Sequence, residues 1–186
     1  ITGTGTPGAE IQIRGGAEAL AAGEVGDDGG FSVPVQLKAN QSNTLLLSQA
    51  SSTGESTATE YTVIHDDIAP DNPTLDPVST PTRRTSVTLS GTAEANGEVV
   101  VAGGMEEVIG AVDAEGRLSV LAGLNNAVST PTDNNLSVQA RDLAGNLSGA
   151  TDLPIVHTPA LPIDAPVLEA MATHTNSTSL TVSGTT

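Results

Sequence analysis

Acidic residues in the turns are the side chains of this sequence best suited to chemistry. Carboxylate and amide oxygens are the ligands that a hard cation such as Ca²⁺ needs, about 6 to 8 per ion. The candidate ligands fall in four short stretches between apolar runs: Asp66, Asp67, Asp71, Glu94, Asp113, Glu115, Asp142 and Asn146. The same sequences, Asp-x-Glu-Gly and Asp-x-x-Gly-Asn, are also ordinary turns in which Asp accepts from a local amide. Two interpretations therefore stay open, a calcium site or a set of turns.

The sequence lacks the residues and motifs of the common catalytic sites. It contains no Cys, which excludes disulfides and thiolate metal sites. It also has no Gly-x-Ser-x-Gly, His-Glu-x-x-His or phosphate-binding Gly-Lys-Ser/Thr motif. His65 and His157 stand at the same position of an internal repeat, which favours a structural role, and Lys38 is the only lysine, so Lys–Asn isopeptide bonds cannot form in both repeats. We expect a protein that is not an enzyme and has no cofactor other than calcium.

The strong negative charge restricts the partners of the protein. The formal net charge of -16 comes from 22 acidic and 6 basic residues, and it repels nucleic-acid phosphates and anionic lipids. No apolar run approaches the about 20 residues that span a bilayer. Phe31 and Tyr61 are the only aromatic residues, whereas sugar sites usually present an aromatic ring. We expect no nucleic-acid partner and no direct membrane insertion, and a carbohydrate-binding module is a less favoured alternative.

A short motif recurs at nearly constant spacing and divides the chain into repeats. Ser-Gly-Thr follows an alternating apolar stretch at residues 90–92 and 183–185, and residues 2–4, Thr-Gly-Thr, are a close copy. The central glycines are 88 and 93 positions apart, which is the length of one small β domain. Residues 162–185 also match residues 70–92 with one insertion. The sequence thus predicts three units: residues 1–68, a domain lacking its first strand; residues 69–158, a complete domain; and residues 159–186, the first two strands of a third.

The second repeat contains seven alternating stretches separated by Gly, Asn, Asp and Pro turns, and these predict seven strands. They lie near residues 74–80, 86–90, 98–102, 107–112, 117–122, 136–141 and 152–157. Seven short strands in one small domain are typical of an antiparallel β-sandwich. Because the strands alternate in direction, the chain enters and leaves each domain at opposite ends, so we expect the domains to stack end to end as a rod.

The same alternation gathers the candidate ligands at one pole of the second domain. The loops after its second, fourth and sixth strands must lie at the end where the chain enters, next to the acidic linker. The other junctions are weaker: Ser52 stands where the second repeat has Asp142, residues 3–6, Gly-Thr-Gly-Thr, replace Gly-Thr-Ala-Glu, and Thr158-Pro159 replaces Asp66-Asp67. If calcium is bound, we expect it at the first junction.

Four motifs in a constant order resemble the bacterial immunoglobulin-like repeats of large cell-surface and adhesin-type proteins. They are residues 66–70, Asp-Asp-Ile-Ala-Pro; 90–97, Ser-Gly-Thr-Ala-Glu-Ala-Asn-Gly; 113–120, Asp-Ala-Glu-Gly-Arg-Leu-Ser-Val; and 140–146, Ala-Arg-Asp-Leu-Ala-Gly-Asn. The resemblance implies a sandwich module of an extracellular stalk or adhesin on a bacterial cell surface, in some cases with calcium at the domain junctions. It does not imply an enzyme.

Two functional classes remain in view. The first is a stalk or spacer in adhesion, whose partners are the neighbouring repeats of the same chain. The second is a fibre- or coat-forming subunit that assembles by strand exchange, an idea raised by the missing first strand and the spare strands at the C-terminus. The opening residues resemble the end of a strand rather than a signal peptide, so we expect any export signal or anchor to lie outside this sequence.

Overall fold

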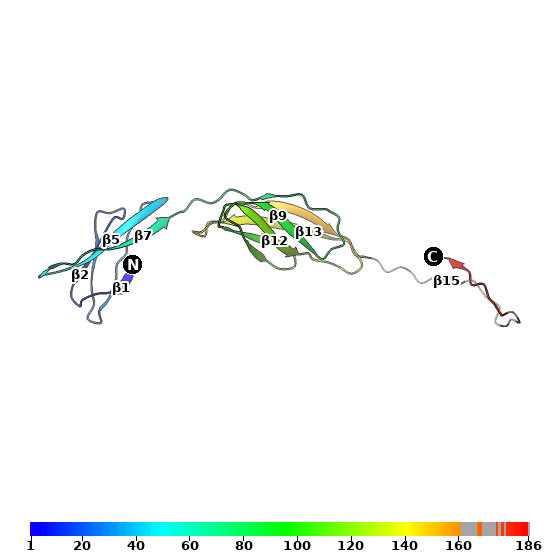
Figure 1. Cartoon of the computed structure of the whole chain (residues 1–186), viewed down its shortest axis with the longest axis horizontal. Coiled ribbons are helices and arrows are strands. Elements are labelled where there is room, and N and C mark those ends of the chain that lie inside the picture. Colours follow the sequence, from blue (N-terminus) through cyan, green and yellow to red (C-terminus); the bar gives the residue numbers. More distant parts are fainter. Residues whose placement is uncertain (161–166, 169–173, 175, 177, 186) are drawn as a thin grey trace.

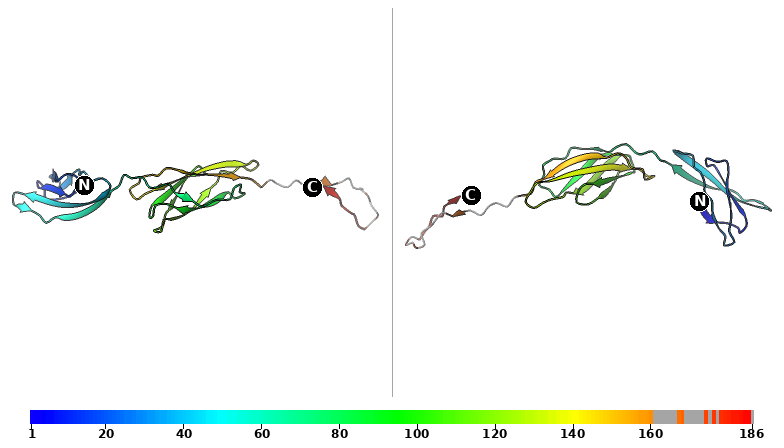
Figure 2. Two further views of the ribbon diagram at one scale, coloured as in Figure 1. Left: turned by 90° about the horizontal axis from the view of Figure 1, so that it is seen from above. Right: turned by 180° about the vertical axis from the view of Figure 1, so that it is seen from behind.

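Two β-sandwich domains follow one another along the chain (Figure 1). The computed structural model describes residues 1–160, 167–168, 174, 176 and 178–185, and these residues form strands, turns and loops without a helix. Two further views show the domains arranged in sequence along the long axis (Figure 2). The predicted all-β class, tandem antiparallel sandwiches arranged end to end, is confirmed.

The second domain has seven strands in two sheets. They are β8 (Thr74–Leu75), β9 (Ser86–Thr92), β10 (Glu98–Ala102), β11 (Val108–Ala111), β12 (Arg117–Gly123), β13 (Thr132–Arg141) and β14 (Thr151–His157). One sheet has the order β11-β10-β13-β14 and the other β12-β9-β8, and all the pairs are antiparallel. Alternation decides which side chains turn inward, as on β12, where Leu118, Val120 and Ala122 are buried. The first predicted strand, residues 74–80, is shorter than expected, because only Thr74 and Leu75 pair with β9.

The first domain repeats this plan without a counterpart of β8 among the described residues. Its strands are β1 (Thr2–Thr4), β2 (Glu10–Arg14), β3 (Ala21–Glu24), β4 (Gly30–Ser32), β5 (Gln41–Ser51), β6 (Gly54–Glu55) and β7 (Thr59–His65). β1 pairs with β4, and the second sheet has the order β3-β2-β5, with both β6 and β7 paired to β5. β1 to β5 and β7 therefore correspond to β9 to β14, in that order.

Two short strands lie within residues 159–186, the predicted third unit. β15 (Val167–Leu168) pairs with β16 (Gly184–Thr185), and Leu168 lies opposite Gly184. In the second domain Leu75 lies opposite Gly91 in the same way. Within the positions predicted for this unit, residues 161–166, 169–173, 175, 177 and 186 lie outside the described residues.

A buried asparagine closes the same corner in each domain. The side-chain oxygen of Asn134 accepts from the backbone N–H of Asn125 (2.7 Å), and its amide donates to the carbonyls of Asn125 and Thr132. Asn43 makes the matching set with Lys38 and the carbonyl of Gln41. Because an unmade hydrogen bond is costly in the interior, each asparagine fixes the loop that enters β5 or β13.

The segment around β8 spans both sheets of the second domain. The N–H of Asp76 donates to the carbonyl of Ser90 on β9 (2.8 Å), whereas the N–H of Thr82 donates to the carbonyl of Val156 on β14 (2.9 Å). A side chain at Gly91 would collide with the carbonyl oxygen of Thr74, and Gly91 has a φ of 153°. Gly91 of the Ser-Gly-Thr motif is therefore a glycine because the first strand passes directly over it.

Candidate functional site at the domain junction

The linker between the two domains, residues 66–70, is hydrogen-bonded to both of them. The N–H of Asp67 donates to the side-chain oxygen of Asn40 in the first domain (3.0 Å). The side-chain amide of Asn146 in the second domain donates to the backbone carbonyl of Asp66 (3.2 Å). The Asp66 carboxylate meanwhile accepts from the N–H of Ile68 (3.0 Å). Two adjacent linker residues thus contact loops of different domains.

Asp142 organises the loop that touches the linker. One of its carboxylate oxygens accepts from the N–H groups of Gly145 (2.7 Å) and Asn146 (2.9 Å), and the other accepts from the Asn146 side-chain amide (2.8 Å). These bonds, first the one from the Asn146 side chain, lower the pKa of Asp142, although its burial acts in the opposite direction. The residue is 7% exposed. Asp142 is therefore a charged turn-capping group that holds Asn146 against Asp66.

The other predicted ligands lie in two separate arrangements. Asp71 and Glu94 line one open hollow of the second domain together with Asn72 and Thr74. Asp113 closes its own turn, since its carboxylate accepts from the N–H groups of Glu115 (3.0 Å) and Arg117 (2.7 Å).

The structure therefore brings together only part of the predicted ligand set. Asp142, Asn146 and the carbonyl of Asp66 are neighbours, whereas Asp67 contacts Asn40 instead. Among residues 1–160 and the other described positions, no group of three or more His, Asp or Glu side chains is placed to hold a metal ion. The Asn146 side-chain N–H groups donate to both the Asp142 carboxylate and the Asp66 carbonyl, so the acceptor oxygens that meet here are one carboxylate and one backbone carbonyl, a set smaller than the one the strand directions predicted.

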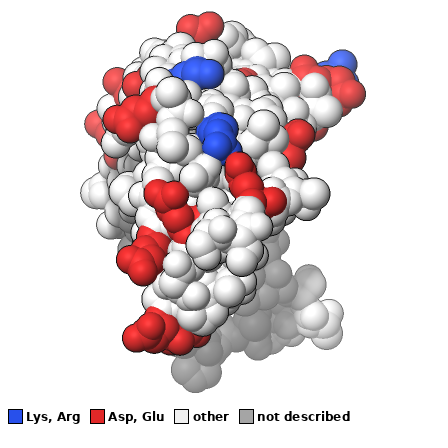
Figure 3. Space-filling model, turned by 90° about the vertical axis from the view of Figure 1, so that its left-hand side faces the viewer, with Lys and Arg blue, Asp and Glu red and all other residues white. Residues whose placement is uncertain are grey.

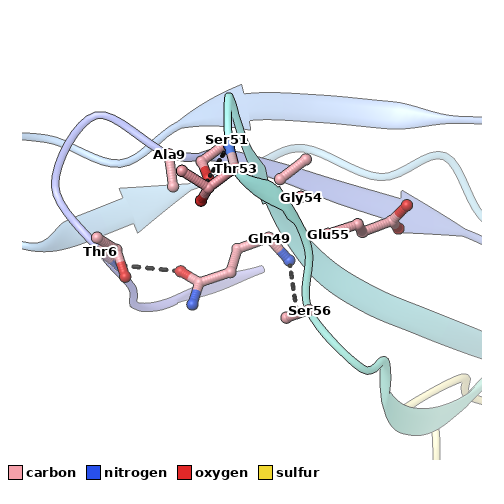
Figure 4. A pocket seen from close by; sticks show the side chains of 9 residues that line it. Thr6, Ala9, Gln49, Ser51, Thr53, Gly54, Glu55 and Ser56 are labelled. Atoms are coloured by element: carbon pink, nitrogen blue, oxygen red, sulfur yellow. Dashed lines mark hydrogen bonds between the residues drawn. The ribbon is translucent and has the colours of Figure 1, made fainter.

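The corresponding end of the first domain has no aspartate at the position equivalent to Asp142. Glu10 pairs with Ala50 and Glu98 with Arg141, so the residue equivalent to Asp142 is Ser51 and not Ser52 as the sequence comparison had it. Here the chain turns back at once, and Ser51 pairs with Gly54. Figure 4 shows the hollow at this place, with Gln49 bonded to both Thr6 and Ser56.

A serine hydroxyl is the part of this pole that both domains share. Ala140 donates its N–H to the hydroxyl of Ser148 (2.8 Å), and the N–H of Ser148 donates back to the carbonyl of Ala140 (2.9 Å). Gln49 and Ser56 make the same two bonds in the first domain. Both domains thus share this pair of hydrogen bonds, whereas the loop of Asp142 is found only in the second domain among the described residues.

On the face seen from the first-domain end (Figure 3), the charged side chains are spread out rather than gathered in one patch. Figure 3, an end-on view, shows Asp and Glu scattered across the visible face among few Lys and Arg. Two ion pairs are present in the described part of the chain, Arg14 with Glu55 and Arg141 with Glu98. The second ties β13 to β10 beside the Asp142 loop.

The two histidines at equivalent strand ends differ in surroundings. Nδ1 of His65 accepts from the N–H of Asn40 (3.2 Å). His157 is buried, and its Nδ1 has no hydrogen-bond partner among the described residues. Both histidines end a paired strand, His65 on β7 and His157 on β14, and their structural role stays a prediction.

Sequence reasoning passed over the asparagines of the junction. Asn40 receives Asp67 and has a φ of 54°, and the Asn72 side chain donates to the carbonyl of Ala150 (3.5 Å). The one available signal was that Asn in a turn tolerates positive φ. That signal marks a turn, but it does not indicate which other segment lies against it.

The fold and the junction define the class of this protein: immunoglobulin-like β-sandwiches joined in tandem. The family model of the bacterial Ig domain matches residues 1–66 and 69–156. These two matches cover most of the sequence, and the chain therefore belongs to the bacterial Ig domain family.

Two solved structures of bacterial adhesins are similar to this chain. One is of a Ca²⁺-stabilised adhesin that helps an Antarctic bacterium reach out and bind ice; it is 24% identical, with 90% of this chain and 45% of that chain covered and a TM-score of 0.36. The other concerns a 1.5-MDa bacterial ice-binding adhesin and its retention at the host cell surface. It is 21% identical, with 85% of this chain and 55% of that chain covered and a TM-score of 0.31. The chain spans about half the length of each of them. No curated protein matches it.

None of the described residues belongs to a helix with the length and apolar character required to cross a membrane.

Proposed function

We propose that this chain is a non-catalytic stalk or spacer segment of an extracellular or cell-surface adhesion protein. Membership of the bacterial Ig domain family and the end-to-end order of the two domains support this proposal. In such a segment the sandwiches supply folded length, and the junction decides how far that length is kept straight. Neighbouring repeats of the same chain are then the immediate partners.

The observation that carries the proposal is the linker bonded at both sides. Asp67 is held by Asn40 of one domain and Asp66 by Asn146 of the other. A freely jointed linker would need neither bond. A spacer that transmits length benefits from both, because each bond removes bending freedom that a flexible connection would keep.

The test measures the distribution of distances between the domains. One spin label is placed on each domain, and pulsed electron paramagnetic resonance is recorded for the full chain and for Asn40→Ala and Asn146→Ala. We expect a narrow distribution that broadens in both variants, with Asn135→Ala as the control because Asn135 is an exposed residue of β13 away from the linker. A broad distribution in the unaltered chain would contradict the spacer proposal.

Calcium at the junction is the finer part of the proposal. The Asp142 carboxylate and the Asp66 carbonyl, which both accept from the Asn146 side-chain amide, support it, and a cation there would offset the repulsion within the acidic linker. Millimolar CaCl₂ should raise the melting temperature or narrow the distance distribution, a chelator should reverse the change, and Asp142→Ala should abolish the difference. If neither quantity responds to calcium, this part fails, while the unaltered distance distribution still decides the spacer proposal.

A further inference from the structure

The two domains differ in the length of one loop at the end where the chain leaves them. In the first domain Asn43 bonds to Lys38, five positions earlier, and in the second Asn134 makes the same hydrogen bonds to Asn125, nine positions earlier. Because both asparagines close the same corner, the second domain has nine minus five, thus four, additional residues between the same anchors. We call residues 126–131 the exit loop, since β13 begins directly after them, beside the end of β14.

The exit loop lies on the surface of the second domain. Residues 128–131, Val-Ser-Thr-Pro, are all exposed, and Val128 is 88% exposed. Residues 38–42, the matching loop of the first domain, are exposed as well, although the complete second domain follows them. A following domain therefore leaves this corner open, and the exposure is a property of the loop itself.

The exit loop does not make the contacts that its counterpart makes in the first domain. There, the side chain of Asn40 accepts from the N–H of Asp67 (3.0 Å), and the N–H of Asn40 donates to Nδ1 of His65 (3.2 Å). The registers of β5 with β7 and of β13 with β14 place Pro131 where the first domain has Asn40. Proline has no N–H, and Nδ1 of His157 accordingly has no partner in the described part of the chain. The exit loop is thus released from both contacts.

The sequence of the exit loop occurs a second time in the same domain, in a different setting. Residues 78–82 and 128–132 are both Val-Ser-Thr-Pro-Thr. In the first copy the Thr80 hydroxyl accepts from the N–H of Val156 (2.9 Å), and the valine packs against the core. In the second copy the hydroxyls of Ser129 and Thr130 have no hydrogen-bond partner among the described residues. The same five residues therefore stabilise the fold in one place and present free hydroxyls in the other.

The exit loop carries no charge of its own. Residues 118–132 contain no Asp, Glu, Lys or Arg, and the first acidic residue after them is Asp133. The exposed Arg83 and Arg84 follow the first copy of the pentapeptide, whose last residue, Thr82, pairs with the end of β14. In a chain with a formal net charge of -16, this end repels an anionic reactant less than the acidic linker does.

We propose that the hydroxyls of Ser129 and Thr130 are acceptors for an O-linked sugar, transferred from a sugar donor activated by a diphosphate. The hydroxyl oxygen forms a bond to C1 of the sugar, and the bond from C1 to the donor phosphate oxygen breaks. Its electron pair leaves with the diphosphate, and the hydroxyl proton passes to a base of the transferring enzyme. Segments that combine Ser, Thr and Pro are typical of O-glycosylated stalks. The choice of a sugar rests on the extracellular or cell-surface function proposed above.

The experiment is mass spectrometry of the protein purified from the bacterium that produces it. Trypsin releases the exit loop within residues 118–141 and the first copy of the pentapeptide within residues 39–83. We expect the mass of one or more sugar residues on the first of these peptides, located at Ser129 or Thr130 by electron-transfer fragmentation. Thr132 and Thr80 are the matched controls, because their hydroxyls already accept from backbone N–H groups. Both controls should be unmodified.

A double variant, Ser129→Ala with Thr130→Ala, produced in the same bacterium, should lose the added mass entirely. An unmodified peptide 118–141 in the native protein overturns the proposal, and so does a phosphate in place of the sugar. Modification of Thr80 to the same extent as Thr130 also overturns it, because the pentapeptide sequence and not its exposure would then select the site. None of these outcomes alters the distance distribution between the domains, which tests the spacer function separately.

Discussion

The two domains of this chain share a strand plan and differ in how completely they are closed. In the second domain twelve buried apolar residues form one core, and in the first only six do. The difference follows the segment around β8, which covers β14 but has no described counterpart over β7. A sandwich of this type thus depends on one strand that bridges both sheets, because that strand buries the inner face of the last one. We expect the first domain to unfold at the lower temperature.

The largest expected effect comes from cutting into the larger core. Leu136 on β13 is 0% exposed, and Leu136→Ala should destabilise the second domain by about 2–5 kcal/mol through lost burial and a cavity. Differential scanning calorimetry of the full chain should show two transitions, of which only the upper one moves. Leu121→Ala, at an exposed position of β12, is the control. If both transitions moved together, the two domains would unfold as one unit and the comparison would lose its meaning.

A smaller and symmetric effect is expected at the buried asparagines. Asn43→Ala and Asn134→Ala each remove the side-chain partners of buried backbone groups, which costs about 1–3 kcal/mol. Each variant should lower the transition of its own domain by a similar amount, since the two corners are built alike. Asn135→Ala, one residue away and exposed, should change little. If only one of the two variants lost stability, the two asparagines would share their hydrogen bonds but not their contribution to the stability of their domains.

The smallest expected effect is a difference between the two domains in how acid changes their melting temperatures. In the second domain the pKa of Asp142 is lowered, first by the side-chain hydrogen bond from Asn146. Its stabilisation is therefore complete above the unfolded pKa of about 4 and is lost as the pH falls through the lower folded value. Asp142→Asn should make the upper transition less sensitive to acid without altering the lower one, in thermal scans from neutral pH downward. Equal acid sensitivity in the variant and the unaltered chain would assign the loss to other groups.

The first domain has its own acid-sensitive group, which provides the counterpart experiment. The pKa of Glu55 is lowered by its hydrogen bond to Ser48 and by Arg14, so its stabilisation is lost as the pH falls. Glu55→Gln should therefore make the lower transition alone less sensitive to acid. Asp142→Asn and Glu55→Gln together show whether each carboxylate changes the acid sensitivity of its own domain only.

Periodicity predicted most of the fold, because each strand carries its own alternation. β10 begins and ends where the sequence predicted, and β9, β11, β12 and β14 differ from their predicted bounds by two residues or fewer. β8 was predicted too long: the residues after Leu75 leave β9 and reach across to β14, and local alternation does not register a strand that changes sheets. Residues 1–68, 69–158 and 159–186 remain the predicted limits of the three units.

The candidate site was predicted in part. Strand direction placed the linker, the loop of Asp142 and the loop of Glu94 at the same pole, and Asn146 does contact Asp66. It did not resolve which side chains converge, because Asp113 and Asp142 each satisfy their oxygens within their own turns.

The sequence alone determined the class of this protein: repeat length, seven alternating stretches and acidic turns are local or periodic features, which single residues and their spacing specify. Only the tertiary structure decided that the segment around β8 joins both sheets of the second domain, and which loops meet at the junction. Those outcomes depend on contacts between segments far apart in the chain, such as Asn146 with Asp66 and Thr82 with Val156. The recurring Ser-Gly-Thr shows both levels, since its spacing counts the repeats, whereas Gly91 is explained by the strand that crosses it in the second domain.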